Sequence, residues 1–297
     1  MRARRRATLP LVVVAVLVAT MLLAGCAARK TDDTPIAESA GHDLAYKMPE
    51  GASLRYEMTS AMTQTVVVRD QSAETETTSA SALTVNSTGM RNGAYRLDVT
   101  IDDMKIDVTG PGGSFSPDLA SVIGQSFEMG LTAIGDEVDF PEHDAIQYDV
   151  GPAGKRSAVS MFSMMFPNVA GRPVEIGDTW TTTDGFTDEG DGFVMAIDFE
   201  AINTLAGFET FGGYECARIT TMFTGTTSAG WKEGPADVTS EGDIEGTSVW
   251  YFAPKEGILV SDATESTGTS TILAMTPEGE MEIPATMVTK FETHIVP

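Results

Sequence analysis

The sequence predicts a mainly β protein, a curved antiparallel sheet or incomplete barrel with about two short helices, on three observations. Long stretches alternate apolar and polar residues with a period of two, as half-buried strands do. Turn signals separate these stretches, and Asn92-Gly93 is the strongest of them for a hairpin. Only two short segments show helical spacing of apolar residues.

The first long strand begins near Ser53. One face carries apolar side chains and the other carries Arg55, Glu57, Thr59 and Thr63. The apolar face consists of Leu54, Tyr56, Met58, Met62, Val66 and Val68. At about 3.3 Å per residue the strand would span roughly 50 Å, so it must curve within a compact domain.

The next two strands are predicted on either side of Asn92-Gly93. Apolar residues occupy odd positions from Tyr95 to Ile101 and even positions from Met104 to Val108. Because a strand keeps one parity on each face, this change predicts a bulge near Asp102-Asp103.

Two helices are expected to interrupt the sheet. The first begins at Ser116-Pro117-Asp118, and the second ends before Pro167. Their apolar stripes are Leu119, Val122, Ile123 and Phe127 in the first helix, and Ala158, Met161, Phe162, Met165 and Phe166 in the second. Residues 127–140 between them are predicted to form one strand.

The second half is again rich in predicted strands. These cover residues 178–183, 193–205, 214–226, 247–253, 257–265, 269–275 and 281–296. Gly51 and Asn92-Gly93 are echoed by Gly177 and Gly212-Gly213 at similar but unequal offsets. The domain at 51–297 is therefore interpreted as one unit with two possible halves, 51–150 and 172–297, which a duplication would produce. The residues that all β-strands and turns favour explain the similarity of the two halves about as well.

The first 25 residues are typical of a secretory signal. Arginines at positions 2 and 4–6 precede an apolar run at 9–23, which is short for a membrane span. The run ends in Leu23-Ala24-Gly25-Cys26, which resembles the bacterial lipobox. That resemblance implies cleavage before Cys26 and acylation of Cys26, so several acyl chains would anchor the protein in a membrane.

Residues 26–50 are predicted to be the lipidated cysteine and a flexible tether, because they are small, polar and charged. The predicted location is the extracytoplasmic side of a bacterial membrane. Ala27 and Ala28 follow the cysteine where some inner-membrane lipoproteins carry Asp, which favours the outer membrane where a cell has two.

The charge of the chain excludes some partners. Without the signal, 15 basic and 43 acidic residues remain, which gives a net charge of about −28. Such a surface repels nucleic acid, so no nucleic-acid partner is expected. It also repels an anionic bilayer, so the acyl anchor is the expected membrane contact.

Two resemblances follow from these features. The lipobox, polar tether, long amphipathic strands and Met/Phe-rich helix resemble the half-barrel lipoproteins of bacterial envelopes, including Lol-type and mycobacterial lipid carriers. Three local strings are similar to those of a family of uncharacterised bacterial lipoproteins. They are Val174 to Trp180, Tyr214 to Ile219 and Trp250 to Val260. Neither resemblance supplies catalytic residues.

The sequence predicts no enzyme, no cofactor and no metal site of a common type. With Cys26 acylated, Cys216 is left without a disulfide partner and is interpreted as a buried thiol. The three histidines, His42, His143 and His294, are far apart in sequence. A weak Ca²⁺ candidate is a predicted glycine-rich acidic loop with Asp184, Asp188, Glu189 and Asp191, for which a solvated turn is the preferred interpretation.

The Met/Phe-rich helix motivates the functional hypothesis. Met161, Phe162, Met165 and Phe166 are predicted to line a site for an apolar ligand or lipid, because Met adapts its shape to varied apolar partners. The alternative is a plain core helix in a structural or protein-interaction lipoprotein with a filled core.

Overall fold

The computed structural model describes residues 41–68, 70–141, 145–150, 154–190, 192–233, 236–276 and 279–296. The signal, Cys26, His143 and Asp191 lie outside the described residues. The strands are β1 (Ser53–Val68), β2 (Gln71–Arg91), β3 (Ala94–Gly110), β4 (Gly113–Phe115), β5 (Ser126–Thr132), β6 (Glu137–Val138), β7 (Gln147–Asp149), β8 (Lys155–Ser157), β9 (Thr179–Gly190), β10 (Phe193–Phe211), β11 (Tyr214–Glu233), β12 (Ala236–Ala253), β13 (Ile258–Thr276) and β14 (Gly279–Val296).

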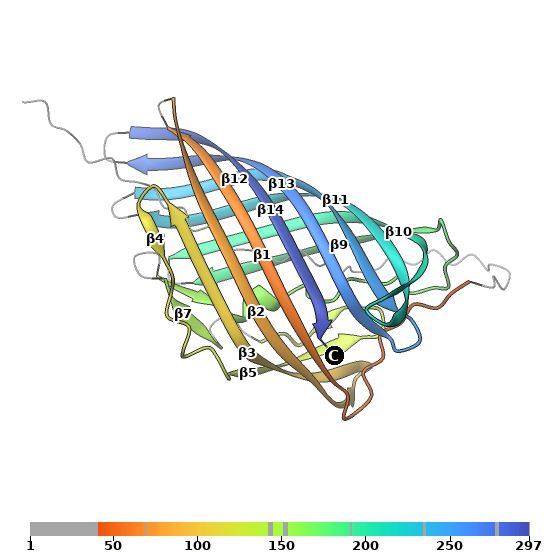
Figure 1. Ribbon diagram of the computed structural model, residues 1–297. Helices are drawn as coiled ribbons and strands as arrows, with labels where there is room; N and C mark the ends of the chain where they lie inside the picture. The colour runs from red at the N-terminus through yellow and green to blue at the C-terminus, as the bar shows by residue number, and fades with distance from the viewer. Residues whose placement is uncertain are drawn as a thin grey trace, which may run out of the picture.

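One rolled antiparallel sheet dominates the molecule (Figure 1). The strand order is β6-β5-β3-β2-β1-β14-β13-β12-β11-β10-β9, with β4 paired to β3. The first strand therefore pairs with the last in the middle of the sheet, and β6 and β9 form its two edges. The curved antiparallel sheet predicted from the sequence is confirmed.

The roll has two ends. The tether end holds Gly41 and the hairpins β2–β3, β10–β11 and β12–β13, and the far end holds the turns that join β1 to β2 and β13 to β14. Both halves run across the sheet in the same direction, from β9 to β14 and from β1 to β6. The echoed turns Asn92-Gly93 and Gly212-Gly213 both lie at the tether end, which is compatible with a duplication.

Local details of β1 to β3 follow the sequence patterns. The even positions of β1 face inward, and Tyr56 and Met58 are buried. Asn92 and Gly93 both have positive φ, as a type I′ hairpin turn requires. Ala82 pairs with Asp103 and Leu83 with Ile101, so the expected bulge is present at Asp102.

Several strands are longer than predicted. β12 begins at Ala236 rather than near 247, and β13 joins two predicted strands into one. Their added residues are mostly Gly, Ser, Thr and acidic residues, which carry little apolar periodicity. Pairing with neighbours on both sides supplies the stabilisation that intrinsic propensity does not. In contrast, the single strand predicted at 127–140 is two strands, β5 and β6.

Glycines allow the strong curvature of the sheet. A Cβ on Gly242 would lie 2.2 Å from the carbonyl oxygen of Thr269 on β13, and one on Gly225 would lie 2.2 Å from that of Asp198 on β10. Only a residue without a side chain lets adjacent backbones approach this closely.

We expect Gly242→Ala to lower the free energy of unfolding by about 1–3 kcal/mol, because the methyl group forces β12 and β13 apart. The matched control is Gly230→Ala, where the nearest atom, a methyl of Val194, is 3.5 Å away. Urea denaturation of both variants measures the difference. Equal stabilities would contradict this role of Gly242.

Neither expected α-helix is present. Residues 119–125 form a single turn, which Gly124 ends with a positive φ. In the second segment only Val159–Phe162 form a 3₁₀ helix, because Ser163 is extended and Met164 has φ 63°. The apolar spacing there reflects burial on all sides, since every described residue from 156 to 169 except Ser163 is buried.

These two segments and residues 41–50 cover the concave face of the sheet at its tether half (Figure 1). Leu44, Tyr46 and Met48 alternate inward from an extended chain, and the hydroxyl of Tyr46 donates to the carbonyl of Pro167 at 2.8 Å. The main hydrophobic core therefore lies between the sheet and its own connecting segments. At the far end a smaller core, which includes Val238 and Ile272, joins strands of the sheet alone.

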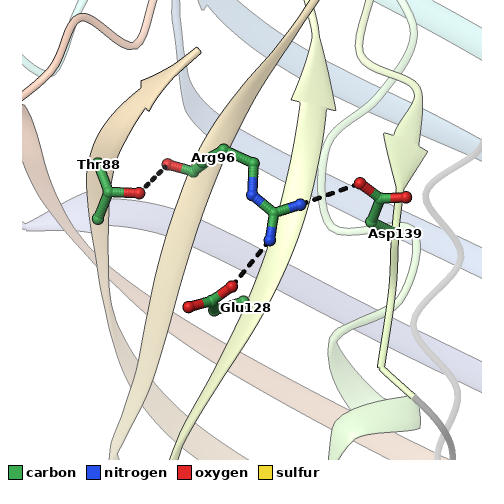
Figure 2. A network of polar contacts seen from close by, with 4 residues as sticks. All are labelled: Thr88, Arg96, Glu128 and Asp139. Atoms are coloured by element: carbon green, nitrogen blue, oxygen red, sulfur yellow. Dashed lines mark hydrogen bonds and ion pairs between the residues drawn. The ribbon is translucent and has the colours of Figure 1, made fainter. Parts of the chain in front are cut away.

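Polar contacts on the outer side of the sheet fasten the β6 edge. Figure 2 shows Arg96 of β3 donating to Glu128 of β5 at 2.8 Å and to Asp139, just after β6, at 2.9 Å. The hydroxyl of Thr88 donates to the backbone oxygen of Arg96.

Within the described part of the chain, no helix has the length and apolarity to cross a bilayer.

Candidate functional site

The four residues predicted to line a ligand site are packed in the main core. Met161, Phe162, Met165 and Phe166 are each at most 7% exposed. The ring of Phe166 meets the rings of Tyr46 and Tyr56 edge to face, with centroids 5.7 and 6.1 Å away. These side chains therefore hold the connecting segment against the sheet.

A short segment of the same connection, residues 164–168, closes the gap between the two sheet edges. On the β6 side, the backbone N–H groups of Met164 and Phe166 donate to the carboxylate of Glu137 at 2.8 and 3.1 Å. The amide of Asn168 donates to Asp136 at 3.1 Å. On the β9 side, the indole N–H of Trp180 donates to the backbone oxygen of Asn168 at 3.0 Å. We call residues 164–168 with Glu137 and Trp180 the seam.

Buried carboxyl groups lie along the seam. Burial raises the pKa of Glu137 to about 7, although its hydrogen bonds from the backbone oppose the shift. Burial also raises the pKa of Asp184 on β9 to about 8, and the charges of Glu137, Asp136 and Asp198 add to the effect. One oxygen of Asp184 is buried with no hydrogen-bond partner among the described residues. Near neutral pH these groups change charge inside the fold.

A second polar cluster crosses the inside of the sheet from β9 to β13. Asn203 donates to Thr182 and accepts from Thr221, whose hydroxyl also accepts the indole N–H of Trp250. Further along, the hydroxyl of Ser248 donates to Asp262, and burial raises the pKa of Asp262 to about 7.

The described residues line small, partly open cavities on the inner side of the roll, and two of them bear on the candidate site. One, of about 30 Å³, is lined by Asp262 of the second polar cluster and by Asn168 of the seam. It has room for about two waters. The other, of about 60 Å³, lies between β1, β14 and β10, and we call it the central cavity. Among its lining residues are Met62, Gln64, Met195, Trp231 and Met287. Neither cavity is lined by Met161, Phe162, Met165 or Phe166.

The acidic Ca²⁺ candidate is not the glycine-rich loop that was expected. Residues 184, 188 and 189 belong to strand β9, where successive side chains point to opposite faces. Asp188 is buried and accepts from Ser160 at 2.8 Å, whereas Glu189 is not buried. The described residues contain no group of three or more His, Cys, Asp or Glu side chains that could hold a metal ion.

The remaining polar candidates are also placed. Cys216 is buried, and burial raises the pKa of its thiol to about 11, which keeps it protonated at neutral pH. His42 lies against the ring of Phe208, with centroids 4.2 Å apart, and His294 lies 3.7 Å from Glu57 on the convex face.

Sequence reasoning missed the buried acids of the seam and of the polar cluster. Asp262 lies two residues after Val260 on β13, so the two side chains point to the same, inner face of the sheet. An aspartate at a position where the strand pattern calls for an apolar residue could therefore have predicted a buried acid. Glu137 lies in a two-residue strand, and no periodicity marks it. Only the path of residues 164–168 brings backbone donors to it.

No protein-family model and no curated protein matches this sequence. Solved structures that are similar to this chain include the following three. An outer membrane channel of Pseudomonas putida F1 is 7% identical, with a TM-score of 0.26, covering 87% of this chain and 100% of its own. The β domain of the Bordetella autotransporter BrkA is 9% identical, with a TM-score of 0.25, covering 82% and 100%.

The third is an exported protein with a YmcC-like fold from Bacteroides fragilis, 10% identical, with a TM-score of 0.25, covering 82% of this chain and 96% of its own.

Proposed function

We propose that this protein is a non-catalytic envelope lipoprotein, anchored through acylated Cys26, that has a filled core and acts through its surface. The observation that supports it is the burial of the Met/Phe segment. The side chains that were expected to contact a ligand pack against other parts of the chain in the main core instead. The size of the cavities also supports it. Sites for small molecules span roughly 300–1,000 Å³, far above the 60 Å³ of the central cavity.

Native mass spectrometry of the mature lipidated protein, extracted from its own membrane, tests the filled core. We expect the mass of the acylated polypeptide and nothing more. A stoichiometric co-purified lipid or other apolar molecule would overturn the proposal.

A second candidate function, binding of a slender apolar ligand, rests on the central cavity. Met62, Met195 and Met287 border it, and flexible Met side chains let a small cavity widen. Uptake of a fluorescent fatty acid that Ala285→Leu abolishes would favour this candidate, since Ala285 lines the cavity. Ala61→Leu on the exposed face of β1 is the matched control. No uptake by the unsubstituted protein rejects the candidate.

The anchor has its own test. We expect Cys26→Ser to remove the acyl chains, leave the signal uncleaved by the lipoprotein route, and change both the intact mass and the membrane fractionation. The physical reason is that the mature surface, with a charge of about −28, has no attraction of its own for an anionic bilayer. An unchanged mass and an unchanged fractionation of this variant would refute acylation.

A further inference from the structure

A row of polar side chains crosses the inner face of the sheet. Each member pairs with the next across neighbouring strands, which lie about 4.8 Å apart. The members are Asn203 on β10, Thr221 on β11, Ser248 on β12 and Thr264 on β13. All four are buried, although the neighbouring inward positions are mostly apolar. We call these four residues the polar row.

Asp262 is buried beside the polar row without a cationic partner. Its side chain is 2% exposed, and it accepts hydrogen bonds from the hydroxyls of Ser248 and Thr264 and from the backbone N–H of Ala263. Burial raises its pKa to about 7, and no charged neighbour among the described residues contributes to the shift. An ionised carboxylate inside a protein is strongly unfavourable unless a cation pairs with it. Ionised Asp262 therefore calls for a cation that the described chain does not supply.

The smaller cavity, of about 30 Å³, gives a cation room beside this carboxyl group. Asp262 lines it together with Thr221 and Ser248, and Asp262 is the only titratable side chain among the described lining residues. Ser248 donates its proton to Asp262 and Thr221 donates its proton to Asn203, so both hydroxyl oxygens keep the capacity to accept. The surroundings of Asp262 therefore offer free oxygen acceptors, which suit a positively charged ligand.

The size and the ligand set of the cavity restrict the cation. A potassium or ammonium ion is about as large as a water molecule, so the cavity has room for one such ion and one water. Calcium takes roughly six to eight oxygen ligands, usually from several carboxylates, whereas this cavity offers a single carboxyl group. Aromatic side chains, whose ring faces attract cations, form part of the remaining lining. A monovalent ion therefore fits better than a divalent one.

We propose that the smaller cavity binds one monovalent cation of the size of potassium or ammonium, with Asp262 as its counter-ion and the oxygens of Ser248 and Thr221 as further ligands. This site goes beyond the proposed function and does not depend on the acyl anchor. On binding, the cation replaces the proton of Asp262, which passes to the solvent. The unfolded chain has no such site, so the bound cation stabilises the folded state.

Urea denaturation of the mature lipidated chain in an uncharged detergent tests the site at pH 8, with potassium replacing choline at constant ionic strength. Choline is too large for a cavity of about 30 Å³, so the replacement changes the ion that can enter but not the screening of surface charges. Above the dissociation constant, we expect each tenfold rise in potassium to raise the ratio of folded to unfolded protein about tenfold. At pH 5 a proton occupies Asp262, so the effect should disappear.

Three variants locate the effect. Asp262→Asn should abolish it, and Glu245→Gln on the exposed face of β12 should keep it. Ala201→Val adds bulk to the cavity lining and leaves Asp262 in place, so it should remove the potassium effect while Asp262 still binds its proton.

The proposal is overturned if potassium and choline give the unsubstituted chain equal stability at pH 8. A potassium effect that persists in Asp262→Asn also overturns it, because the ion would then bind elsewhere on the acidic protein. If calcium acts more strongly than potassium and Asp262→Asn removes its effect, the assignment to a monovalent ion is wrong.

Discussion

Phe166→Ala should lower the free energy of unfolding by about 3–5 kcal/mol, because it removes a buried aromatic ring from the main core. Its side chain is 1% exposed and packs edge to face against the rings of Tyr46 and Tyr56. Truncation would leave a hole that the rolled sheet cannot collapse to fill, because its wall is a continuous ladder of strands.

Urea denaturation measures this loss, and Met222→Ala is the matched control, since a side chain that is 63% exposed should change stability by no more than about 0.5 kcal/mol. The result also separates the two interpretations of the Met/Phe segment. A core role requires the large loss. If Phe166 instead lined an open ligand site, its truncation would enlarge that site and leave stability close to that of the control.

The second large expectation is that the protein loses stability as the pH rises from about 5 to 8. Burial raises the pKa of Glu137 and Asp262 to about 7 and that of Asp184 to about 8, above the values of 4.5 and 3.8 of the free side chains. The folded state therefore binds more protons than the unfolded state in this window, so the free energy of unfolding falls with rising pH. Glu137 and Asp262 each account for on the order of 3 kcal/mol.

Asp262→Asn tests the origin of this slope. The hydroxyls of Ser248 and Thr264, which donate to Asp262, can rotate to accept from an amide, so the variant should fold. We expect a shallower fall in stability between pH 5 and 8 in urea denaturation. Glu245→Gln on the exposed face of β12 changes the net charge equally and serves as the control. Stability that rises over this range, or an unchanged slope in Asp262→Asn, would contradict the assignment.

The seam gives this pH dependence a structural location. Ionised Glu137 and Asp184 repel each other on opposite edges of the sheet, across the segment that joins them. The neutral forms reduce that repulsion. The carboxylate of Glu137 also accepts from the backbone N–H groups of Met164 and Phe166, which only this path of the chain supplies.

Much of the sheet could be predicted because alternation is a local signal. Each of three features depends only on residues that are close in sequence. They are the inward face of β1, the hairpin at Asn92-Gly93 and the bulge at Asp102. The second helix was wrong because burial on every side produces apolar spacing without a helix, and Met164 with its positive φ ends any helical path. The first was wrong because its segment makes a single turn that ends at Gly124, which has a positive φ. The acidic loop was wrong because Asp184 and Glu189 belong to a strand that β10 pairs along its length.

The sequence by itself determined the fold class, the faces of the strands and the turns, because side-chain parity and turn chemistry act over a few residues. The tertiary structure alone decided what fills the concave face, how long β12 and β13 become, and which acids are buried. These depend on partners more than 25 residues away, such as Glu137 with Met164 or Gly242 with Thr269, and on how the rolled sheet brings them together. No local sequence pattern predicts such contacts, because they form only when the rolled sheet packs against its connecting segments, and that packing supplies the free energy that stabilises them.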